Sequence, residues 1–361
     1  RALSLWCGTW NSNAKKPSED LSSWLQQPAD HDVVAVAGQE IVDLNAGNLL
    51  VDHTANRPWE EAVQGVLGPA YVLVASKHMV GCLLCVWVRA EHKDYVQDVQ
   101  LDTAGVGIMG VGGNKGGVAI RFQLYDSTMC FVCSHLAAHK NNVHGRNSDF
   151  HNIIQRIRFE QRSFGMTAPS AQQADAAAGQ DLGVVAPRDL TIYDHDHVFW
   201  LGDLNYRLNL PDLDAVFKRI EVLDWPYLLA HDQLNVERSA GQAFKGWQEG
   251  AIGFAPTYKY QPGTSKYERR EDKKKRFPAW CDRILWTGHG HMELLKYDRA
   301  ELLVSDHKPV YALFSLRAKL LVKERQIKVY QNLVRQLDQW ENEAIPKVSI
   351  SSNGVHFAQC R

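Results

Sequence analysis

The residues best suited to do chemistry follow a short apolar run near the middle of the chain. Val198–Leu201 predicts a buried strand, and Gly202–Arg207 then lies in the loop at the strand's carboxyl end. Asp203 and Asn205 are two residues apart, so they face the same way if the strand geometry continues. A carboxylate beside an amide could deprotonate a water molecule and steady a phosphate. Gly, Asp and Asn are also common in turns, so a plain turn remains the alternative for this motif alone.

Polar side chains also stand at the ends of other predicted strands. They are Asn11 after Leu3–Gly8, Glu40 after Asp32–Ala37, His135 after Met129–Ser134, and Asp306 with His307 before Val310–Phe314. Core strands alone do not require such groups at their ends, so one shared site is the economical interpretation. A carboxylate and an amide, completed by waters and substrate oxygens, suit Mg²⁺, whereas softer metals prefer more imidazole or thiolate. Taken singly, each residue could instead be a structural hydrogen-bonding group or a cap.

The length and charge of the chain limit the classes of function. A chain of 361 residues can form two domains or one large α/β sandwich. The formal net charge of −1 gives no general attraction to polyanions, so any phosphate binding must be local. The longest uncharged apolar run, Met79–Val88, has ten residues, whereas a bilayer span needs about 20, so we expect no transmembrane segment. No signal segment precedes Arg1 and the pattern breaks off at Arg361, so we expect an excised fragment.

The cysteines indicate a reducing compartment. There are seven, an odd number, in a chain with no secretory signal, which favours free thiols in the cytosol. Two pairs have C-x-x-C spacing, Cys82 with Cys85 and Cys130 with Cys133, and could suggest zinc. Both pairs lie in apolar runs that predict strands, where residues three apart point to opposite faces and cannot share a metal. Buried strand cysteines are therefore favoured over a zinc site.

The glycine-rich segment Gly105–Gly110 fits the pattern G-x-G-x-x-G. Asn114–Gly117 and a strand follow it, whereas a dinucleotide site needs a helix there, so that context is absent. Two interpretations remain. The segment is either a glycine loop whose backbone and Lys115 approach a phosphate, or a plain hairpin.

The remaining elements alternate between strands and helices. Helices are predicted over Glu19–Gln26 with Ser18 as N-cap, over Val143–Phe159, and in stretches between Pro211 and Glu237. The other predicted strands are Tyr71–Ala75, Val80–Val88, Val96–Leu101, Val118–Leu124 and Ile284–Trp286.

Two long loops are expected between these elements. Gln161–Arg188 is rich in Ala, Gln and Gly without a clear period, which predicts a mobile surface insertion. Tyr267–Arg276 carries six Lys or Arg residues against three acids. Such a run is usually a solvated loop, but this one directly precedes Pro278–Arg283, which leads into a predicted strand.

The pattern changes after Leu316. Apolar residues recur there with helical spacing, at Leu320, Ile327, Tyr330, Val334 and Leu337, and basic residues lie between them, at Lys319, Lys323, Arg325 and Lys328. Ile345 and Pro346 end this predicted helix, and two alternating runs at 348–350 and 355–357 predict strands. We therefore expect a domain junction after residue 316.

Motifs spread over most of the chain can be compared with known families. They are GTWNSN (Gly8–Asn13), GQE (Gly38–Glu40), GNKGGVAIRF (Gly113–Phe122), SHLAAH (Ser134–His139), WLGDLNYR (Trp200–Arg207), FAPTYKY (Phe254–Tyr260), PAWCDRILW (Pro278–Trp286) and SDHKPV (Ser305–Val310). In this order, along residues 3–316, they resemble the inositol polyphosphate 5-phosphatases. Within that family the chain most resembles the type II group, which includes the Lowe-syndrome protein.

The resemblance implies a fold class and a domain order. The fold is a four-layer α/β sandwich of the DNase I-like type, also found in apurinic endonucleases, with the site where the strand ends of two central sheets meet. Residues 1–316 would be the catalytic domain and 317–345 a linker helix. Residues 346–361 would begin a truncated, all-β, immunoglobulin-like ASH domain.

The resemblance also assigns catalytic roles. Glu40, helped by Asn11, would hold Mg²⁺, and Asp203 would activate the attacking water. The scissile 5-phosphate would be bound by Asn205, His135 and His307. Asp282 would orient His307 and stabilise its charge, while Asp306 would support the metal and imidazole side of the site. In-line phosphoryl transfer to water needs this combination of positioning, a base and positive charge.

Substrate contacts follow from the same motifs. Tyr258, Lys259, Lys274 and Arg276 match the 4-phosphate contacts of the family; Lys115 with His139 or Lys140 would meet the 1-phosphate, and Arg207 completes the substrate-binding set. The family's acidic segment before PAW is replaced here by the basic run, so the Lys273–Arg276 contacts stay open. Apolar residues at 49–51 and at 79–80 fall near lipid-contacting segments of the family, with ordinary core as the alternative.

These features favour one activity over two others. The first is a Mg²⁺-dependent 5-phosphatase acting on phosphatidylinositol 4,5-bisphosphate, and on the 3,4,5-trisphosphate lipid or soluble inositol phosphates. A nuclease of the same fold is disfavoured because no basic stripe for a long phosphate backbone is evident. A non-catalytic module remains compatible with the first, since the helix and ASH segment could bind a Rab-type GTPase. We expect a cytoplasmic protein, peripheral on membranes, with no nucleic-acid partner.

Overall fold

The protein divides into two compact units, Arg1–Ala318 and Lys319–Arg361. The structure, a computed structural model, describes residues 1–25, 31–42, 56–79, 81–106, 115–161, 189–270, 272–273, 276–344, 348–351 and 354–357. Several predicted features lie outside these residues, namely the apolar segment 49–51, Val80, most of the glycine-rich segment and of the Gln161–Arg188 insertion, and Lys274.

The first sheet of the larger unit carries the chain's amino terminus. Its six described strands run in the order β11-β12-β1-β2-β4-β3. Their bounds are β1 Ala2–Asn11, β2 Val33–Gln39, β3 Tyr71–Met79, β4 Cys82–Arg89, β11 Met292–Arg299 and β12 Val310–Arg317. β1 is parallel to β2, and the other neighbours are antiparallel, so the sheet is mixed.

The second sheet is also mixed. Within the described residues its order is β5-β6-β7-β8-β10-β9. The bounds are β5 Val96–Gly105, β6 Gly116–Leu124, β7 Ser127–His135, β8 His197–Asp203, β9 Gln248–Glu249 and β10 Asp282–Thr287. β7 and β8 are the parallel pair here. The strands predicted from apolar runs are therefore confirmed, several of them with longer bounds.

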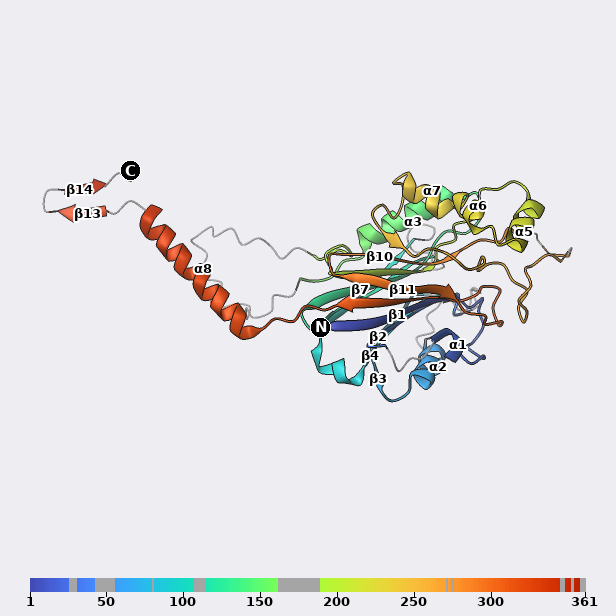
Figure 1. Cartoon of the computed structure of the whole chain (residues 1–361), viewed down its shortest axis with the longest axis horizontal. Helices are drawn as coiled ribbons and strands as arrows, with labels where there is room; N and C mark the ends of the chain where they lie inside the picture. The colour runs from blue at the N-terminus through green and yellow to red at the C-terminus, as the bar shows by residue number, and fades with distance from the viewer. Residues whose placement is uncertain are drawn as a thin grey trace. The chain divides into compact units, whose positions relative to one another are not determined.

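The two sheets pack face to face (Figure 1), and their central strands, such as β2 and β8, are buried on both sides. Along β8, Phe199 and Leu201 enter the core between the sheets, whereas Val198 and Trp200 enter the core on the outer face. The same alternation confirms the prediction for the cysteines. Cys82 and Cys133 lie in the core between the sheets, and Cys85 and Cys130 lie in the outer cores.

Helices cover the outer face of each sheet (Figure 1). The first sheet carries α1 (Ser22–Leu25) and α2 (Arg57–Leu67), whose Trp24 and Trp59 pack edge-on against Trp10 at centroid distances of 5.8 and 5.7 Å. The second sheet carries α3 (Val143–Arg156), α5 (Leu213–Glu221), α6 (Trp225–Ala230) and α7 (Gln233–Ser239). The 3₁₀ helix η2 (Ala90–Tyr95) joins β4 to β5, across the two sheets. The order helix, sheet, sheet, helix is the predicted sandwich.

Some local predictions were wrong. The helix predicted from Glu19 begins instead at Ser22, and Ser18 does not cap it: Asp20 Oδ1 accepts from the Ser22 backbone N–H at 2.9 Å. α3 ends at Arg156 because Phe159 pairs with Leu190 in an isolated bridge. α2 and β11 were not predicted at all. β11 is an edge strand with a bulge, and four charged residues interrupt its apolar ones, so it has no continuous apolar run.

The smaller unit contains one long helix and a hairpin. α8 spans Lys323–Ala344, and β13 (Val348–Ser351) pairs with β14 (Gly354–Phe357) in an antiparallel hairpin. The predicted helix and both predicted strands are confirmed. Among the described helices, none combines the length and the apolar composition that crossing a membrane requires.

Candidate active site

Strand pairing brings the predicted site residues to one edge of the two sheets. In the first sheet Asn11 pairs with Gln39, so Glu40 follows directly beside Asn11. In the second sheet His135 and Asp282 both pair with Asp203, one from each side. Parallel strands end at the same edge, which is why residues far apart in the sequence meet here.

Asp203 is the last residue of β8, and Asn205 lies in the turn that follows. The strand geometry does not continue: Asn205 adopts a φ of 57°, and its backbone N–H donates to Asp203 Oδ1 at 3.0 Å. This turn, closed by the Asp203 side chain, places both Asp203 and Asn205 on the cavity. The two residues therefore lie together as predicted, but a turn and not a continued strand brings them there. The preceding Gly202 has a φ of 153°, and a Cβ there would lie 2.0 Å from the Ser134 carbonyl oxygen. Only glycine fits at that position.

Arg207 holds the Asn205 amide in place. Its Nε donates to the Asn205 backbone oxygen at 3.1 Å, and its guanidinium also contacts Asn205 Oδ1. Asn205 Nδ2 donates one N–H to the Leu136 carbonyl at 3.0 Å, which leaves the second N–H of the amide available to a ligand. The Arg207 guanidinium also lies over the Tyr258 ring, 4.2 Å from its centroid. Arg207 therefore acts on the site through Asn205 and Tyr258.

Two carboxylates from different sheets converge on one amide. Asn11 Nδ2 donates to Asp203 Oδ2 at 2.9 Å and to Glu40 Oε1 at 3.2 Å. Glu40 adopts a φ of 49°, and Ser12 Oγ fixes its backbone by donating to the Glu40 carbonyl at 2.9 Å. Such a group of oxygen donors fits a hard divalent cation such as Mg²⁺ or Ca²⁺ better than a soft one. Glu40 and Asn11 are thus where a metal could be held.

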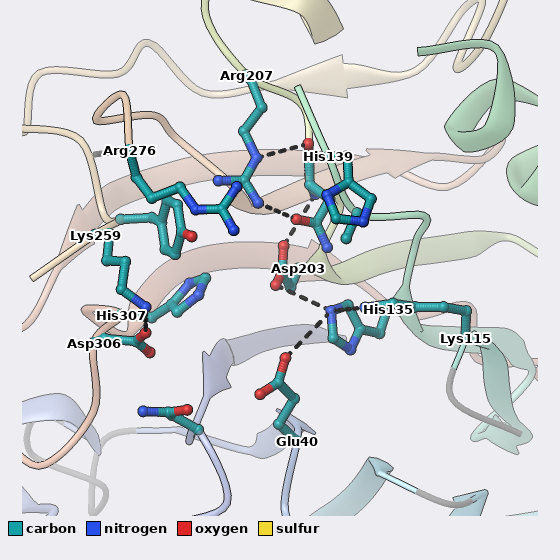
Figure 2. Close-up of a pocket in the computed structure, with 14 residues that line it drawn as sticks. Glu40, Lys115, His135, His139, Asp203, Arg207, Lys259, Arg276, Asp306 and His307 are labelled. Carbon is teal, nitrogen blue, oxygen red and sulfur yellow. Dashed lines mark hydrogen bonds and ion pairs between the residues drawn. The ribbon is translucent and has the colours of Figure 1, made fainter. Parts of the chain in front are cut away.

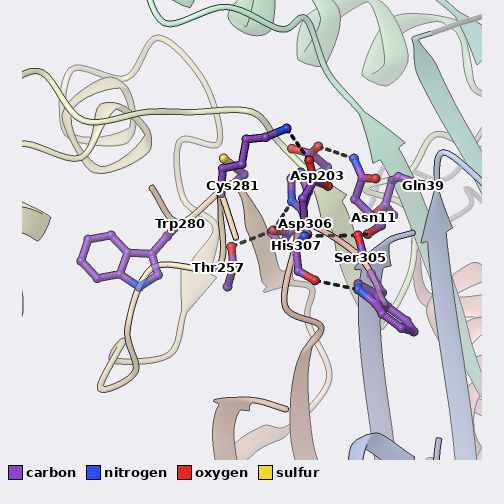
Figure 3. A network of polar contacts seen from close by, with 12 residues as sticks. Asn11, Gln39, Asp203, Thr257, Trp280, Cys281, Ser305, Asp306 and His307 are labelled. Atoms are coloured by element: carbon purple, nitrogen blue, oxygen red, sulfur yellow. Dashed lines mark hydrogen bonds and ion pairs between the residues drawn. The ribbon is translucent and has the colours of Figure 1, made fainter. Parts of the chain in front are cut away.

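His307 forms a buried pair with Asp282. Asp282 Oδ2 lies 2.9 Å from His307 Nδ1 and accepts from Thr257 Oγ1 at 2.7 Å (Figure 3). Burial alone would lower the pKa of His307, but the Asp282 carboxylate outweighs it and raises this pKa to about 9. The imidazole is therefore protonated at neutral pH. Trp10 Nε1 donates to the His307 carbonyl at 3.0 Å and fixes the backbone.

Asp203, Asp282 and His307 also offer ligand atoms within 4.8 Å of one another. His307 Nδ1 and Thr257 already occupy the Asp282 oxygen that faces them, and a protonated imidazole cannot ligate a cation. This trio is therefore better described as an ion-paired acid than as a second metal site.

His135 and Lys115 lie on the opposite side of Asp203. His135 Nε2 is 3.2 Å from Asp203 Oδ2 and 3.8 Å from Glu40 Oε1, and it also contacts Lys115 Nζ (Figure 2). Burial, followed by the Lys115 charge, lowers the pKa of His135, so this imidazole is neutral at neutral pH. Burial would raise the pKa of Asp203, but His135, His307 and Lys115 outweigh it and hold that pKa well below its usual range. Asp203 is therefore ionised.

These groups line one cavity of about 200 Å³ (Figure 2). Its lining residues are Asn13, Glu40, Lys115, His135, Ala138, His139, Asp203, Asn205, Arg207, Tyr258, Lys259, Arg276, Asp306 and His307. Sequence analysis did not identify Asn13 and Ala138, although both belong to motifs that it quoted. Asn11 and Asp282 are not among the lining residues; Asn11 contacts both Glu40 and Asp203, and Asp282 contacts His307.

Three further predicted site residues differ in what the structure shows of them. Lys140 does not line the cavity: its Nζ donates to the Leu210 carbonyl at 2.5 Å and lies 3.7 Å from the Phe277 ring centroid. Asp306, predicted to support the metal and imidazole side of the site, lines the cavity; its Oδ2 is 2.5 Å from Lys259 Nζ, and its charge also helps to raise the pKa of His307. Lys274 lies outside the described residues.

A buried arginine supports the loops that carry the site. Arg146 of α3 donates to the carbonyls of Ala137, His139 and Lys140 at 3.2, 2.7 and 3.2 Å, and to Gln233 Oε1 at 2.6 Å. The same Gln233 oxygen accepts from the Arg207 backbone N–H at 2.8 Å. Arg146 therefore ties the loop after β7 to the loop after β8. Its burial gave no signal in the sequence, where an arginine in a helix predicts an exposed side chain.

Comparison with known proteins agrees with this geometry. Residues 8–313 match the family model described as Endonuclease/Exonuclease/phosphatase family 2. A mouse "Type II inositol 1,4,5-trisphosphate 5-phosphatase" is 39% identical over 97% of this chain, and the chain spans 33% of that protein's length. An Arabidopsis thaliana "Type I inositol polyphosphate 5-phosphatase 8" is 38% identical, with 88% of this chain and 71% of that protein covered.

A solved structure is also similar to this chain. The inositol polyphosphate 5-phosphatase domain of SPsynaptojanin, in complex with inositol (1,4)-bisphosphate and calcium ion, is 30% identical and superposes with a TM-score of 0.80. The match covers 95% of this chain and 93% of that one. The larger unit therefore has the DNase I-like fold, and the chain belongs to the inositol polyphosphate 5-phosphatase family.

Proposed function

We propose that the chain hydrolyses the 5-phosphate of phosphatidylinositol 4,5-bisphosphate, and of related inositol polyphosphates, by attack of a water molecule at phosphorus. The observation that carries the proposal is one cavity in which the ionised Asp203 and the side chain of Glu40 face a protonated imidazole, an amide and several basic side chains. A compact polyphosphate fits such a cavity better than a long nucleic-acid backbone does. Removing a 5-phosphate from inositol 1,4,5-trisphosphate leaves inositol 1,4-bisphosphate, the molecule held by the SPsynaptojanin domain.

The scissile phosphate would be held by three kinds of donor. The protonated His307 supplies a charged N–H from its Nε2, because Asp282 occupies Nδ1. The second N–H of Asn205 supplies a second bond, and the His135 imidazole, which contacts Lys115, is proposed to supply the third. These donors are fixed before the substrate arrives, so they can stabilise the charge that develops on the non-bridging oxygens.

Asp203 would orient the attacking water. Its strongly lowered pKa makes it a weak base in the resting cavity, so its first function is to accept a hydrogen bond and align the water with the phosphorus. As the water loses its proton, the Asp203 carboxylate is the nearest buried acceptor, and the neutral His135 at 3.2 Å is the next. A proton can therefore move from water to the Asp203–His135 pair.

Glu40, with Asn11, would hold the divalent metal, and we propose Mg²⁺ for it. When bound, the metal supplies Lewis-acid stabilisation of the phosphate and of the leaving inositol oxygen. The chain provides a carboxylate at Glu40 that is one-third exposed and reachable from the cavity, and an amide already shared between Glu40 and Asp203. Mg²⁺ keeps several waters, so two protein ligands are sufficient.

The phosphate next to the scissile one would meet the opposite wall. Tyr258, Lys259 and Arg276 line that wall, and the Lys259 charge is secured by Asp306. Burial opposes this charge, but Asp306 outweighs it and raises the pKa of Lys259. On the other side, His139 and Lys115 are proposed to meet the 1-phosphate. Lys140 is less suited to this, since its ammonium already donates to Leu210.

The smaller unit is proposed to serve recruitment and not catalysis. We propose that 317–345 is a linker helix and that 346–361 begins an ASH domain, through which a Rab-type GTPase could bring the enzyme to a cytoplasmic membrane surface. The exposed apolar side chains of α8 support a binding role, among them Ile327, Tyr330, Leu337 and Trp340.

The test is phosphate release from short-chain phosphatidylinositol 4,5-bisphosphate with Mg²⁺ and with chelator. Release should require the metal, and Asp203→Asn should lower kcat by about 10²–10⁴-fold because the water loses its charged acceptor. Asp212→Asn is the matched control, since Asp212 is an exposed helix cap of α5 outside the cavity and Asn caps equally well. Cleavage of abasic DNA without lipid hydrolysis would favour a nuclease, and neither activity would leave only a binding module.

A further inference from the structure

α8 carries an apolar stripe along one face. Four of its apolar residues follow one another at spacings of three, four and three: Ile327, Tyr330, Val334 and Leu337. This spacing places them on one side of the helix, and their side chains are between 37 and 68% exposed. A helix gains most of its stability when such a face packs against another surface. We call these four residues the α8 seam, and it is suited to packing against a partner.

The α8 seam has the a and d pattern of a short coiled coil. Its first and third residues are seven apart, and so are its second and fourth, so they alternate as the two core positions of a heptad. The same pattern continues to Lys323 on the amino-terminal side and to Glu341 on the carboxyl-terminal side. The seam is therefore bounded by a cation at one end and by an anion at the other.

The charges of α8 are divided between its two halves. Residues 323–332 include three basic residues and one acid, whereas residues 333–344 include one basic residue and three acids. This order opposes the helix dipole, whose amino-terminal end is positive, so the charges of a lone α8 destabilise it. A second helix of the same sequence that runs the opposite way places each acidic half beside a basic half. The charge pattern of α8 therefore fits another α8 in antiparallel orientation.

We propose that α8 pairs with α8 of a second copy of this chain in an antiparallel coiled coil. The dimer joins two catalytic units through their smaller units, so that one recruitment event brings two copies to a membrane surface. The pairing itself does not depend on the proposed phosphatase activity.

The register of the pair follows from the symmetry of the pattern about Asn332. Lys323 and Glu341 each lie nine residues from Asn332, and the seam residues lie two and five residues away on either side. When Lys323 faces the partner's Glu341, the two seams therefore meet as four apolar layers between two Lys–Glu layers. In a parallel pair each of these charges would face its own copy, and like charges repel. The end charges thus select the antiparallel orientation.

Other residues flank the seam on its two sides. Leu333 and Trp340, which are 52 and 64% exposed, directly precede core positions and widen the apolar stripe on one side. On the other side Glu324 and the partner's Asp338 come near each other and repel. Both are exposed, so this repulsion is weak compared with the burial of the seam.

Sedimentation equilibrium of the full chain measures the association directly. The wild type should form a dimer in concentration-dependent equilibrium with monomer. The Kd should rise at least about 100-fold in Ile327→Asp, which places a charge in two apolar layers of each dimer. Lys323→Glu and Glu341→Lys should each raise the Kd about ten-fold, because each puts like charges opposite one another at both ends. The double variant Lys323→Glu with Glu341→Lys should return to about the wild-type Kd.

Arg325→Glu is the matched control for Lys323→Glu. It makes the same change of charge in the same half of α8, but Arg325 occupies the heptad position that points away from the seam. Its Kd should stay within about two-fold of the wild type. Circular dichroism shows that each variant keeps its helix, and kcat/KM for soluble inositol 1,4,5-trisphosphate should be unchanged in all of them.

Three outcomes would overturn the dimer. A wild-type chain that stays monomeric at about 100 µM would do so, and would leave the α8 seam to the GTPase proposed above. A dimer as stable in Ile327→Asp as in the wild type would place the interface elsewhere. Equal weakening by Lys323→Glu and Arg325→Glu, or a double variant no tighter than the single ones, would exclude the antiparallel pairing. A wild type that dimerises but releases no phosphate would instead sink the proposed function alone.

Discussion

His307 carries a proton at neutral pH because Asp282 contacts its Nδ1 in a buried environment. The folded-state pKa of about 9 lies above the usual value of about 6.5 for histidine. The pair therefore adds stability that is fully present below about pH 6.5 and is lost as the pH rises through about 9. The same proton is the one that the phosphate needs, so binding and stability depend on one ionisation.

Asp282→Asn should move the alkaline limb of the pH dependence of kcat/KM. In wild type the rate should fall as His307 loses its proton near pH 9. Without the Asp282 carboxylate, burial lowers the pKa of His307 against the remaining charges of Asp203 and Asp306, so the limb should shift to lower pH by about one unit or more. Thr257→Val, which removes a hydrogen bond to Asp282 but no charge, should shift it much less. An unchanged limb in Asp282→Asn would show that His307 does not act as the charged donor.

Some residues of the site could be predicted from the sequence, and others could not. Asp203, Asn205, Glu40 and His307 were predicted because polar residues stand beside apolar runs, and the structure gathers all four around one cavity. The environment of Lys140 could not be predicted, because it depends on a contact with the Leu210 carbonyl across the fold. The left-handed backbone of Asn205 was equally hidden, since the residue type permits a turn without requiring one.

At the scale of elements, the two parallel strand pairs do most of the positioning. They bring Asn11, Gln39, His135 and Asp203 to one edge. These strands were predictable because both of their faces are buried and their sequences are continuously apolar. α2 was missed although Trp59, Val63 and Leu67 recur every four residues on its buried face, since this short helix also contains a proline and a glycine, which weaken a helix prediction.

Arg146 should act on catalysis through the loops that it holds. Arg146→Lys keeps the charge but cannot bridge three carbonyls and Gln233, so kcat should fall about ten-fold or more while KM changes little. The buried carbonyls that lose a donor should also lower the free energy of unfolding by about 1–3 kcal/mol. Arg158→Lys, on the segment after α3, is the control, because within the described part of the chain the Arg158 guanidinium donates to the local carbonyls of Ile154 and Ile157. A normal kcat in a destabilised Arg146→Lys variant would show a purely structural role.

Gly202 should tolerate no side chain. A Cβ at this position would lie 2.0 Å from the Ser134 carbonyl oxygen, on a backbone that L-residues rarely adopt. Gly202→Ala should therefore lower the free energy of unfolding by at least about 2 kcal/mol, measured by urea denaturation. Gly253→Ala is the control, since a Cβ there meets no atom within 4 Å. Equal stabilities of the two variants would mean that β7 and β8 can separate without cost.

At the scale of the whole molecule, the larger unit closes on itself. The amino-terminal ammonium of Arg1 donates to the Ala318 carbonyl at 2.8 Å, and the Ala318 N–H donates to the Arg1 carbonyl at 2.8 Å. The site, both sheets and their covering helices all belong to Arg1–Ala318. The unit therefore contains the core and the site of an independent domain.

A chain ending at Ala318 should fold and remain active. We expect kcat/KM for soluble inositol 1,4,5-trisphosphate within about two-fold of the full chain, and a single cooperative unfolding transition. Circular dichroism during heating and a phosphate-release assay measure both. A loss of activity in a chain that still unfolds cooperatively would mean that the smaller unit contributes to the site.

The most direct test of the central claim follows both the position and the oxygen of the reaction. Wild-type protein is given inositol 1,4,5-trisphosphate and Mg²⁺ in ¹⁸O-labelled water, and the products are analysed by ³¹P NMR and mass spectrometry. Attack of a water held by Asp203 predicts inositol 1,4-bisphosphate together with released phosphate that contains one ¹⁸O atom. Loss of the 1- or 4-phosphate, or ¹⁸O on the inositol ring, would contradict the account.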